Sequence, residues 1–187
     1  MRHSLLLLVF VMSVSLEGCV PNNQPKPKPP LSTPMVQKVT IQIGANCPAT
    51  SPIPPGNMTA TEQTLLKLIN DFRGGTGLKF LQPDAAGDIV GVAQWHAKDM
   101  AAHNAVAIVG SDGEDAFTHL GCAGGGANAF AGVATTVIAL GYTTDPKAAL
   151  NALLTNPAAN AAILDPSQVM LFMGVGYSNG YWMIIMN

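Results

Sequence analysis

The stretch Gly174-Val-Gly-Tyr-Ser-Asn-Gly-Tyr-Trp-Met-Ile-Ile-Met186, near the end of the chain, has the pattern of a β-hairpin. Asn-Gly between two runs rich in β-branched and aromatic residues is the strongest short-range hairpin signal. We therefore predict two antiparallel strands, over 169–177 and 180–186, joined at Ser178-Asn179-Gly180.

The same stretch contains Gly-x-Ser-x-Gly at 176–180, which is also the pattern of the nucleophile elbow of serine hydrolases. That elbow requires a strand, a turn and a helix, followed later in the chain by an acidic residue and a histidine. Only seven residues follow Gly180, and none of them is acidic or His. We interpret Ser178 as a turn residue.

Helices are expected upstream of the hairpin. Thr59-Ala-Thr-Glu62 is a capping box that opens a helix through Phe72, and the Gly pair at 74–75 ends it. A second helix is expected over 83–103. Its stripe at helical spacing consists of Ile89, Val92, Ala93, His96, Met100 and His103.

Weaker patterns cover the rest of the domain. Residues 36–43 alternate as a half-buried strand does, and the Gly-rich 110–132 reads as loop. Short helices are expected over 134–140 and 146–154, with a break at 156–157. Helices followed by a terminal hairpin indicate an α+β domain of layered architecture, which we place at 58–187.

The N-terminal part reads as an export signal and a tether. Arg2 and His3 precede an apolar run over 5–16, which is too short for a permanent membrane span. Leu-Glu-Gly-Cys19 resembles a bacterial lipobox, so we expect residues 1–18 to be removed and Cys19 to carry lipid. The alternative is an ordinary cleaved signal with a chance cysteine. Residues 19–57 form a Pro-rich tether and an N-terminal extension.

Composition narrows the possible partners. The net charge is −2, with only 9 Lys and Arg and no basic run, so we do not expect nucleic acid as a partner. If Cys19 carries lipid, Cys47 and Cys122 are the only pair left for a disulfide in an oxidising compartment. The alternative is two free, buried thiols.

The polar motifs favour no cofactor and no metal. His96 and His103 lie seven residues apart, about 10 Å along a helix, which is too far for one zinc ion. Three acids within 111–115 suggest calcium, but the EF-hand spacing is absent and Asp-Gly is ordinary in turns. Glycines 124–126 lack the context of a phosphate loop.

Residues 62–187 resemble the bacterial branch of the CAP superfamily, also called SCP-like. The helix over 65–73 is similar to the family's "lvNefR" segment, and 93–101 to its "A..ha.dMa" helix. Gly110-Ser-Asp-Gly113 matches its "GSDG" loop, 148–164 its "W..SpgHr.nIL" stretch, and 174–182 its closing "vGvGya…yW" hairpin. The resemblance implies an α-β-α sandwich.

The resemblance also implies a cleft whose usual polar residues are missing here. Many members place two His and two acidic residues in a central cleft, which holds zinc in some of them. At three of these positions the chain has Ile108, Ala127 and Ala159, and Leu153 replaces a tryptophan. His119 falls near a position that is usually Arg.

Two functional hypotheses follow. The first is a non-catalytic, membrane-anchored envelope lipoprotein with a degenerate CAP-like domain, which binds a lipid-like ligand, a cell-wall component or an envelope protein. An aliphatic cleft formed by Ile108, Ala127 and Ala159 favours this hypothesis. The alternative is an extracytoplasmic hydrolase of peptide or cell wall that uses His96, His119 and Asp112.

Overall fold

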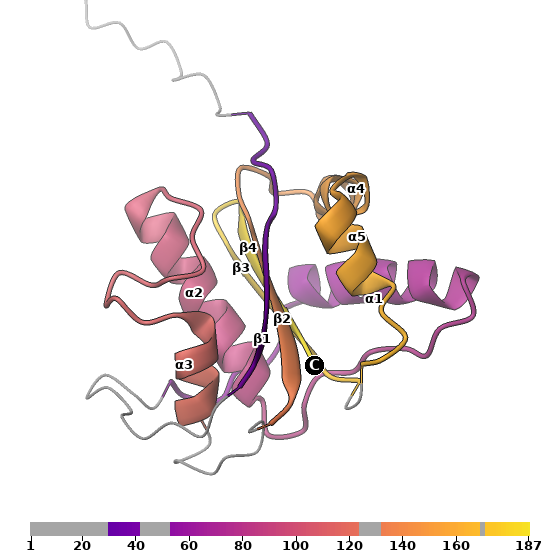
Figure 1. Cartoon of the computed structure of the whole chain (residues 1–187). Helices are drawn as coiled ribbons and strands as arrows, with labels where there is room; N and C mark the ends of the chain where they lie inside the picture. Colours follow the sequence, from indigo (N-terminus) through magenta and orange to yellow (C-terminus); the bar gives the residue numbers. More distant parts are fainter. Residues whose placement is uncertain (1–29, 42–52, 124–131, 169–170) are drawn as a thin grey trace, which may run out of the picture.

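The computed structural model describes residues 30–41, 53–123, 132–168 and 171–187, and these ranges contain both helices and strands (Figure 1). In chain order they are β1 (Met35–Thr40), α1 (Ala60–Gly75), α2 (Asp88–His103), α3 (Ala116–Cys122), β2 (Ala134–Leu140), α4 (Pro146–Thr155), α5 (Pro157–Ile163), β3 (Met173–Ser178) and β4 (Tyr181–Met186). None of the described helices is long and apolar enough to cross a membrane.

The strands form one antiparallel sheet in the order β1-β2-β4-β3, with helices on both faces. Figure 1 shows α2 and α3 on one side of the sheet, and α1, α4 and α5 on the other. The α+β class and the α-β-α sandwich expected from the sequence are confirmed.

Each face of the sheet carries its own buried apolar cluster, because side chains alternate along a strand. On β4, Met183 and Ile185 pack with α2 and α3, whereas Trp182, Ile184 and Met186 pack with α1, α4 and α5. Every residue of β4 is buried. The two central strands are therefore covered on both faces.

The predicted hairpin is confirmed. Ser178 pairs with Tyr181, so Asn179 and Gly180 form a two-residue loop. Their φ angles are 47° and 90°, and a type I′ turn requires positive φ at both positions. Ser178 is the last residue of β3, followed by a turn and a strand; no helix follows it as a nucleophile elbow would require.

The capping box is confirmed as well. The side chain of Thr59 accepts a hydrogen bond from the backbone of Glu62, whose carboxylate accepts one from the backbone N–H of Thr59. Glu62 is buried and also accepts hydrogen bonds from Gln94 Nε2 at 2.9 Å and from the backbone N–H of Tyr177 at 2.8 Å. One carboxylate thus joins α1, α2 and β3.

Two sequence predictions are wrong. Residues 134–140 form β2, a central strand, and not a helix. The Gly-rich region 110–132 was expected to be loop throughout, but it contains α3, capped by Asp115. In addition, α2 begins at Asp88 and not near 83, because Gly87 adopts a left-handed φ of 77° just before it.

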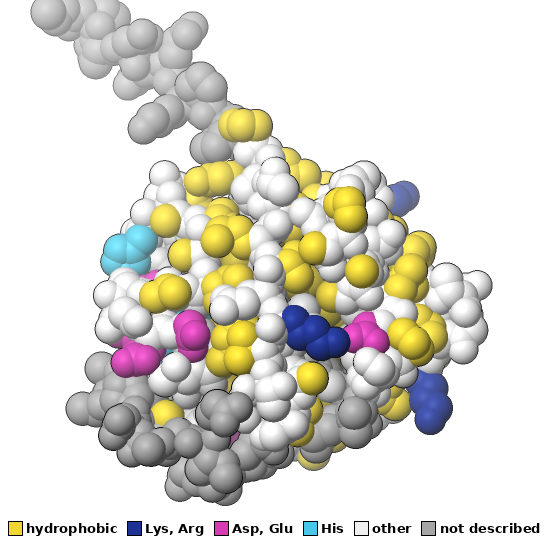
Figure 2. Space-filling view, in the orientation of Figure 1, with side chains coloured by type: hydrophobic (Ala, Val, Ile, Leu, Met, Phe, Trp, Pro, Cys, Tyr) yellow, Lys and Arg dark blue, Asp and Glu magenta, His cyan; other side chains and the backbone are white. Residues whose placement is uncertain are grey.

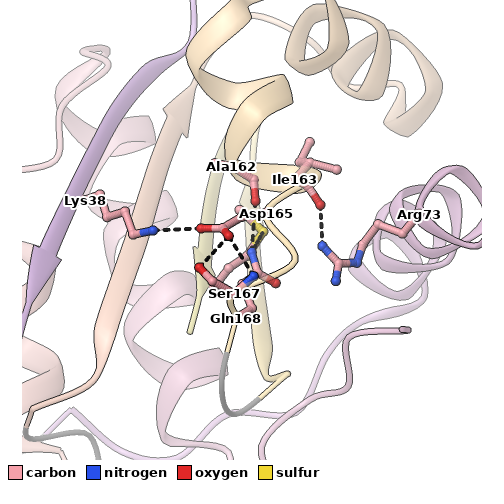
Figure 3. A network of polar contacts seen from close by, with 8 residues as sticks. Lys38, Arg73, Ala162, Ile163, Asp165, Ser167 and Gln168 are labelled. Carbon is pink, nitrogen blue, oxygen red and sulfur yellow. Dashed lines mark hydrogen bonds and ion pairs between the residues drawn. The ribbon is translucent and has the colours of Figure 1, made fainter. Parts of the chain in front are cut away.

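Polar contacts at and just after the end of α5 connect it to α1 and to β1 (Figure 3). Arg73 is buried, and its guanidinium donates to the carbonyl oxygens of Ile163 and Lys79. Lys38 Nζ lies 2.7 Å from Asp165 Oδ2. Hydrogen bonds from Lys38 and Ser167 lower the pKa of Asp165 to about 2.

Candidate functional site

Three polar side chains meet between α2 and α3. His96 comes from the inner face of α2 and His119 from α3, and both are at most 2 % exposed. His96 Nε2 lies 2.9 Å from His119 Nδ1, and His119 Nε2 lies 3.0 Å from Asp112 Oδ2. Asp112 belongs to the loop that precedes α3. The structure therefore brings together the three residues of the hydrolase hypothesis.

The carboxylate determines where the protons lie in this chain of hydrogen bonds. An ionised carboxylate only accepts, so His119 carries its proton on Nε2 and donates to Asp112. His119 Nδ1 and His96 Nε2 share one further proton, so that one of these nitrogens donates and the other accepts. His96, His119 and Asp112 thus each have a hydrogen-bond partner inside the protein.

Burial favours the neutral form of His96. The pKa of His96 is lowered from 6.5 to about 4, first by burial and second by repulsion from His119. The acidic residues Asp99, Asp112 and Asp115 raise it by smaller amounts. His96 is therefore uncharged at neutral pH.

Trp95 packs against both imidazoles. Its ring is edge-on to His96 at 4.8 Å and to His119 at 4.6 Å between centroids. Edge-on contacts of this kind between aromatic rings are favourable. They add to the hydrogen bonds that fix both imidazoles.

The loop over 110–114 is attached to both helices by two consecutive residues. Ser111 bonds to Asp99 of α2 through its hydroxyl, at 2.6 Å, and through its backbone N–H, at 2.9 Å. Asp112 bonds to His119 of α3 and accepts from the backbone N–H of Glu114. The bond from the Glu114 N–H to Asp112 is ordinary turn chemistry, the alternative to the calcium interpretation.

A second polar group lies nearer the surface, on the same helix. His103 Nδ1 is 3.2 Å from Asp99 Oδ1, and 57 % of the His103 side chain is exposed. His103 therefore does not continue the buried stripe that the helical spacing predicted. Ser111 donates to Asp99 and not to an imidazole, so its hydroxyl lies outside the chain of hydrogen bonds from His96 to Asp112.

The positions taken from the family resemblance do not meet in one cleft. Ile108 is buried in the cluster under α2 and α3, whereas Ala159 is buried in the cluster under α1, α4 and α5. These clusters lie on opposite faces of the sheet. Ala127, Cys19 and Cys47 lie outside the described residues, and Cys122 is buried at the end of α3.

Metal binding finds no further support in the described ranges. They contain no group of three or more His, Cys, Asp or Glu side chains placed to hold a metal ion. The two nitrogens that face each other, on His96 and His119, already share a hydrogen bond.

The arrangement can hold or pass a proton, but it lacks a nucleophile. In a Ser-His-Asp triad the imidazole that is bonded to the carboxylate activates a hydroxyl or thiol on its other nitrogen. Here the other nitrogen of that imidazole faces His96, a second imidazole, and not a hydroxyl or thiol.

Comparison with known proteins identifies the fold. No family model matches the chain, and no curated protein matches it. An extracellular protein containing an SCP domain from Bacillus anthracis matches 70 % of this chain with 20 % identity and a TM-score of 0.56. The match spans 44 % of that protein's length. An outer surface protein from Borrelia burgdorferi matches 69 % of this chain over 91 % of its own, with 13 % identity and a TM-score of 0.53. The SCP-like fold is thereby shown.

Proposed function

We propose that this chain is a membrane-anchored, extracytoplasmic binding module with an SCP-like fold and no catalytic centre of its own. The hydrogen-bonded chain from His96 through His119 to Asp112 carries this proposal, because it leaves the Asp-bound imidazole without a nucleophile to activate. Two similar solved structures are of an extracellular protein and an outer surface protein, which supports the proposed location.

The proposed partner is a hydrophobic ligand, a cell-wall component or an envelope protein. Five hollows among the described residues have volumes of about 220 to 360 Å³. These volumes reach only the lower end of the range typical of small-molecule sites. They favour a partner that lies across the surface, such as a polymer or a protein, over an enclosed lipid.

The binding test uses three probes in parallel: purified cell-wall sacculi, phospholipid vesicles and solubilised envelope proteins. We expect the full chain to co-sediment with, or be captured by, one of them. His119→Gln should retain that binding, because the proposal gives the imidazole a structural role. Loss of binding in a folded His119→Gln protein, or binding to none of the probes, contradicts the proposal.

A hydrolase is the second candidate, because the three residues named for it are hydrogen-bonded to one another. Labelled peptide and labelled cell wall are the substrates to test. Turnover by the wild-type chain that His119→Gln abolishes without loss of secondary structure would favour the hydrolase. We expect no turnover by either protein.

The anchor is tested separately. Cys19→Ala should move the protein from the membrane fraction to the soluble envelope fraction, because the acylation site is lost. A single acyl chain binds a membrane only marginally, so we expect Cys19 to carry more than one chain. Full membrane retention of Cys19→Ala contradicts the lipoprotein assignment, and an unrelated surface variant, Lys98→Ala, controls for fractionation.

A further inference from the structure

On the outer edge of β1, the backbone groups of Val36 and Lys38 have no hydrogen-bond partner among the described residues. Ile41, just after β1, donates its N–H to Val133 at 3.1 Å, and its carbonyl accepts from Gly132 at 2.9 Å, so Ile41 is bonded toward β2. Ladder bonds alternate along an antiparallel strand, so the N–H and C=O of Val36 and Lys38 point outward.

The other edge of the sheet is partly occupied. Beside β3, the N–H of Met173 donates to the carbonyl of Gln82 at 2.8 Å, and the N–H of Tyr177 donates to the Glu62 carboxylate at 2.8 Å. An unpaired strand edge is a ready template for another strand. Among the described residues, this template lies at β1.

We propose that two copies of this chain pair through β1, antiparallel, about a two-fold axis that passes through Gln37. The four strands of one copy would then continue into the four strands of the other. An isologous contact of this kind requires a surface that is complementary to itself.

The sequence of β1 meets that requirement in this register. Gln37 faces Gln37 of the second copy, and Met35 faces Val39 of the second copy. Met35 is a large apolar residue that is 44 % exposed, although it lies within a strand. Pairing would cover it with an apolar side chain on the α2–α3 face of the sheet.

Charge does not oppose the pairing. Lys38 lies opposite Val36 of the second copy and not opposite another Lys38. An edge lysine ordinarily discourages pairing. Here, however, its ammonium is bonded to Asp165 at 2.7 Å and is directed toward the segment after α5 (Figure 3).

The surface on both sides of β1 leaves room for a second strand. In the orientation of Figure 1, β1 runs along the front of the molecule, and Figure 2 shows hydrophobic side chains on either side of it. A hollow of about 230 Å³ lies between Val39 and Phe117, and one of about 340 Å³ lies between Val36 and Ala162. Side chains beside an added strand would enter these hollows.

The experiment is a charge exchange at Gln37, read as oligomeric state by light scattering after size exclusion. The full chain carries Cys19→Ala throughout, so that acylation does not drive association. We expect a dimer for the parent protein, and a dimer Kd raised at least 10-fold for Gln37→Asp alone and for Gln37→Lys alone. Mixing the two variants should restore dimers, because opposite charges then face each other across the axis.

A proline provides the second arm. Lys38→Pro removes an outward N–H that β2 does not use, and prolines are tolerated on edge strands. Its matched control, Lys38→Ala, loses the same ion pair but keeps the N–H. We expect Lys38→Pro to be monomeric and Lys38→Ala to be dimeric. If Lys38→Pro fails to fold, the charge exchange decides.

Two results would overturn the inference. One is a parent protein that stays monomeric up to high micromolar concentration. The other is a dimer that neither Gln37 variant weakens, which would place the contact on a different surface. A strand of another protein bound at β1 would give the first result.

Discussion

Gly176 shows how a single residue sets the distance between a helix and a strand. A Cβ atom at Gly176 would lie 2.0 Å from the carbonyl oxygen of Ala93, and one at Gly174 would lie 2.5 Å from that of Ile89. Both contacts are with the backbone of α2, which cannot rotate away as a side chain can. The Gly-Val-Gly sequence of β3 therefore lets α2 lie directly on the strand.

Gly176→Ala should accordingly destabilise the protein by about 1–3 kcal/mol or more, as overpacking of a well-packed core does. Urea denaturation measures the free energy of unfolding. The control is Gly75→Ala at the end of α1, where a Cβ meets nothing within 4 Å. A Gly176→Ala protein as stable as the control would mean that α2 shifts at little cost.

Trp182 and Ser178 differ in their predicted importance, although they are close in sequence. Trp182 is fully buried, its Nε1–H donates to the carbonyl of Thr143 at 2.7 Å, and its ring lies 4.4 Å from that of Tyr177. Trp182→Ala should cost roughly 3–5 kcal/mol of stability.

Ser178→Ala should change stability by less than about 0.5 kcal/mol and leave binding intact. Covalent labelling of Ser178 by a fluorophosphonate would contradict the role given to it.

At the scale of elements, β2 marks the limit of what the sequence could predict. Ala-Thr-Thr-Val-Ile-Ala-Leu over 134–140 has no alternation, because β2 is covered on both faces from Thr135 onward. A short apolar run of this kind fits a buried helix and a buried strand equally well by periodicity. Its β-branched residues favoured the strand. The hairpin, α1 and α4 were predictable because each carries a local turn or cap signal.

The candidate site was predictable in its residues but not in its geometry. His96 could be placed on the inner face of α2 from helical spacing alone. The position of His119 depends on how α3 packs against α2, and α3 itself lies among glycines that suggested loop. The one local signal for α3 was Asp115, whose side chain accepts from the backbone N–H of Thr118. No sequence pattern indicated that the two imidazoles face each other.

The disulfide between Cys47 and Cys122 stays a prediction at this scale, since Cys47 lies outside the described residues. A disulfide between these cysteines would close a loop of about 75 residues. By the chain-entropy model, this could add about 4 kcal/mol to the free energy of unfolding. Mass spectrometry of unreduced peptides from the exported protein should find the two cysteines in one cross-linked species. Alkylation of both thiols without prior reduction would show that they are free.

At the scale of the whole molecule, the sheet separates two apolar clusters, and the polar chain of His96, His119 and Asp112 adjoins only one of them. The cluster under α1, α4 and α5 includes the ring of Trp182, whose polar atom is bonded to Thr143. Mild acid should therefore weaken the packing of α2 and α3 against the sheet before it weakens the packing of α1, α4 and α5.

The stability of the protein should fall as the pH is lowered from about 6.5 to about 4. The pKa of His96 is lowered to about 4 in the folded protein, so within this interval the unfolded chain binds a proton that the folded protein does not. The stability that neutral His96 contributes is complete above the pKa of the unfolded chain, about 6.5. It is lost progressively as the pH falls to the folded pKa of about 4. The total loss is about 3 kcal/mol. Asp88 acts in the opposite sense, since burial and Asp84 raise its pKa.

Comparing the wild type with His96→Gln isolates the histidine, because Asp88 is common to both proteins. Urea denaturation at a series of pH values from 7 to 4 gives the free energy of unfolding of each. The wild type should lose about 3 kcal/mol more than His96→Gln across the series. Asp165 does not interfere, because its pKa of about 2 places its effect at lower pH. Equal slopes for the two proteins would mean that His96 takes up its proton as readily in the folded protein as in the unfolded chain, and therefore that the imidazole pair is open to water.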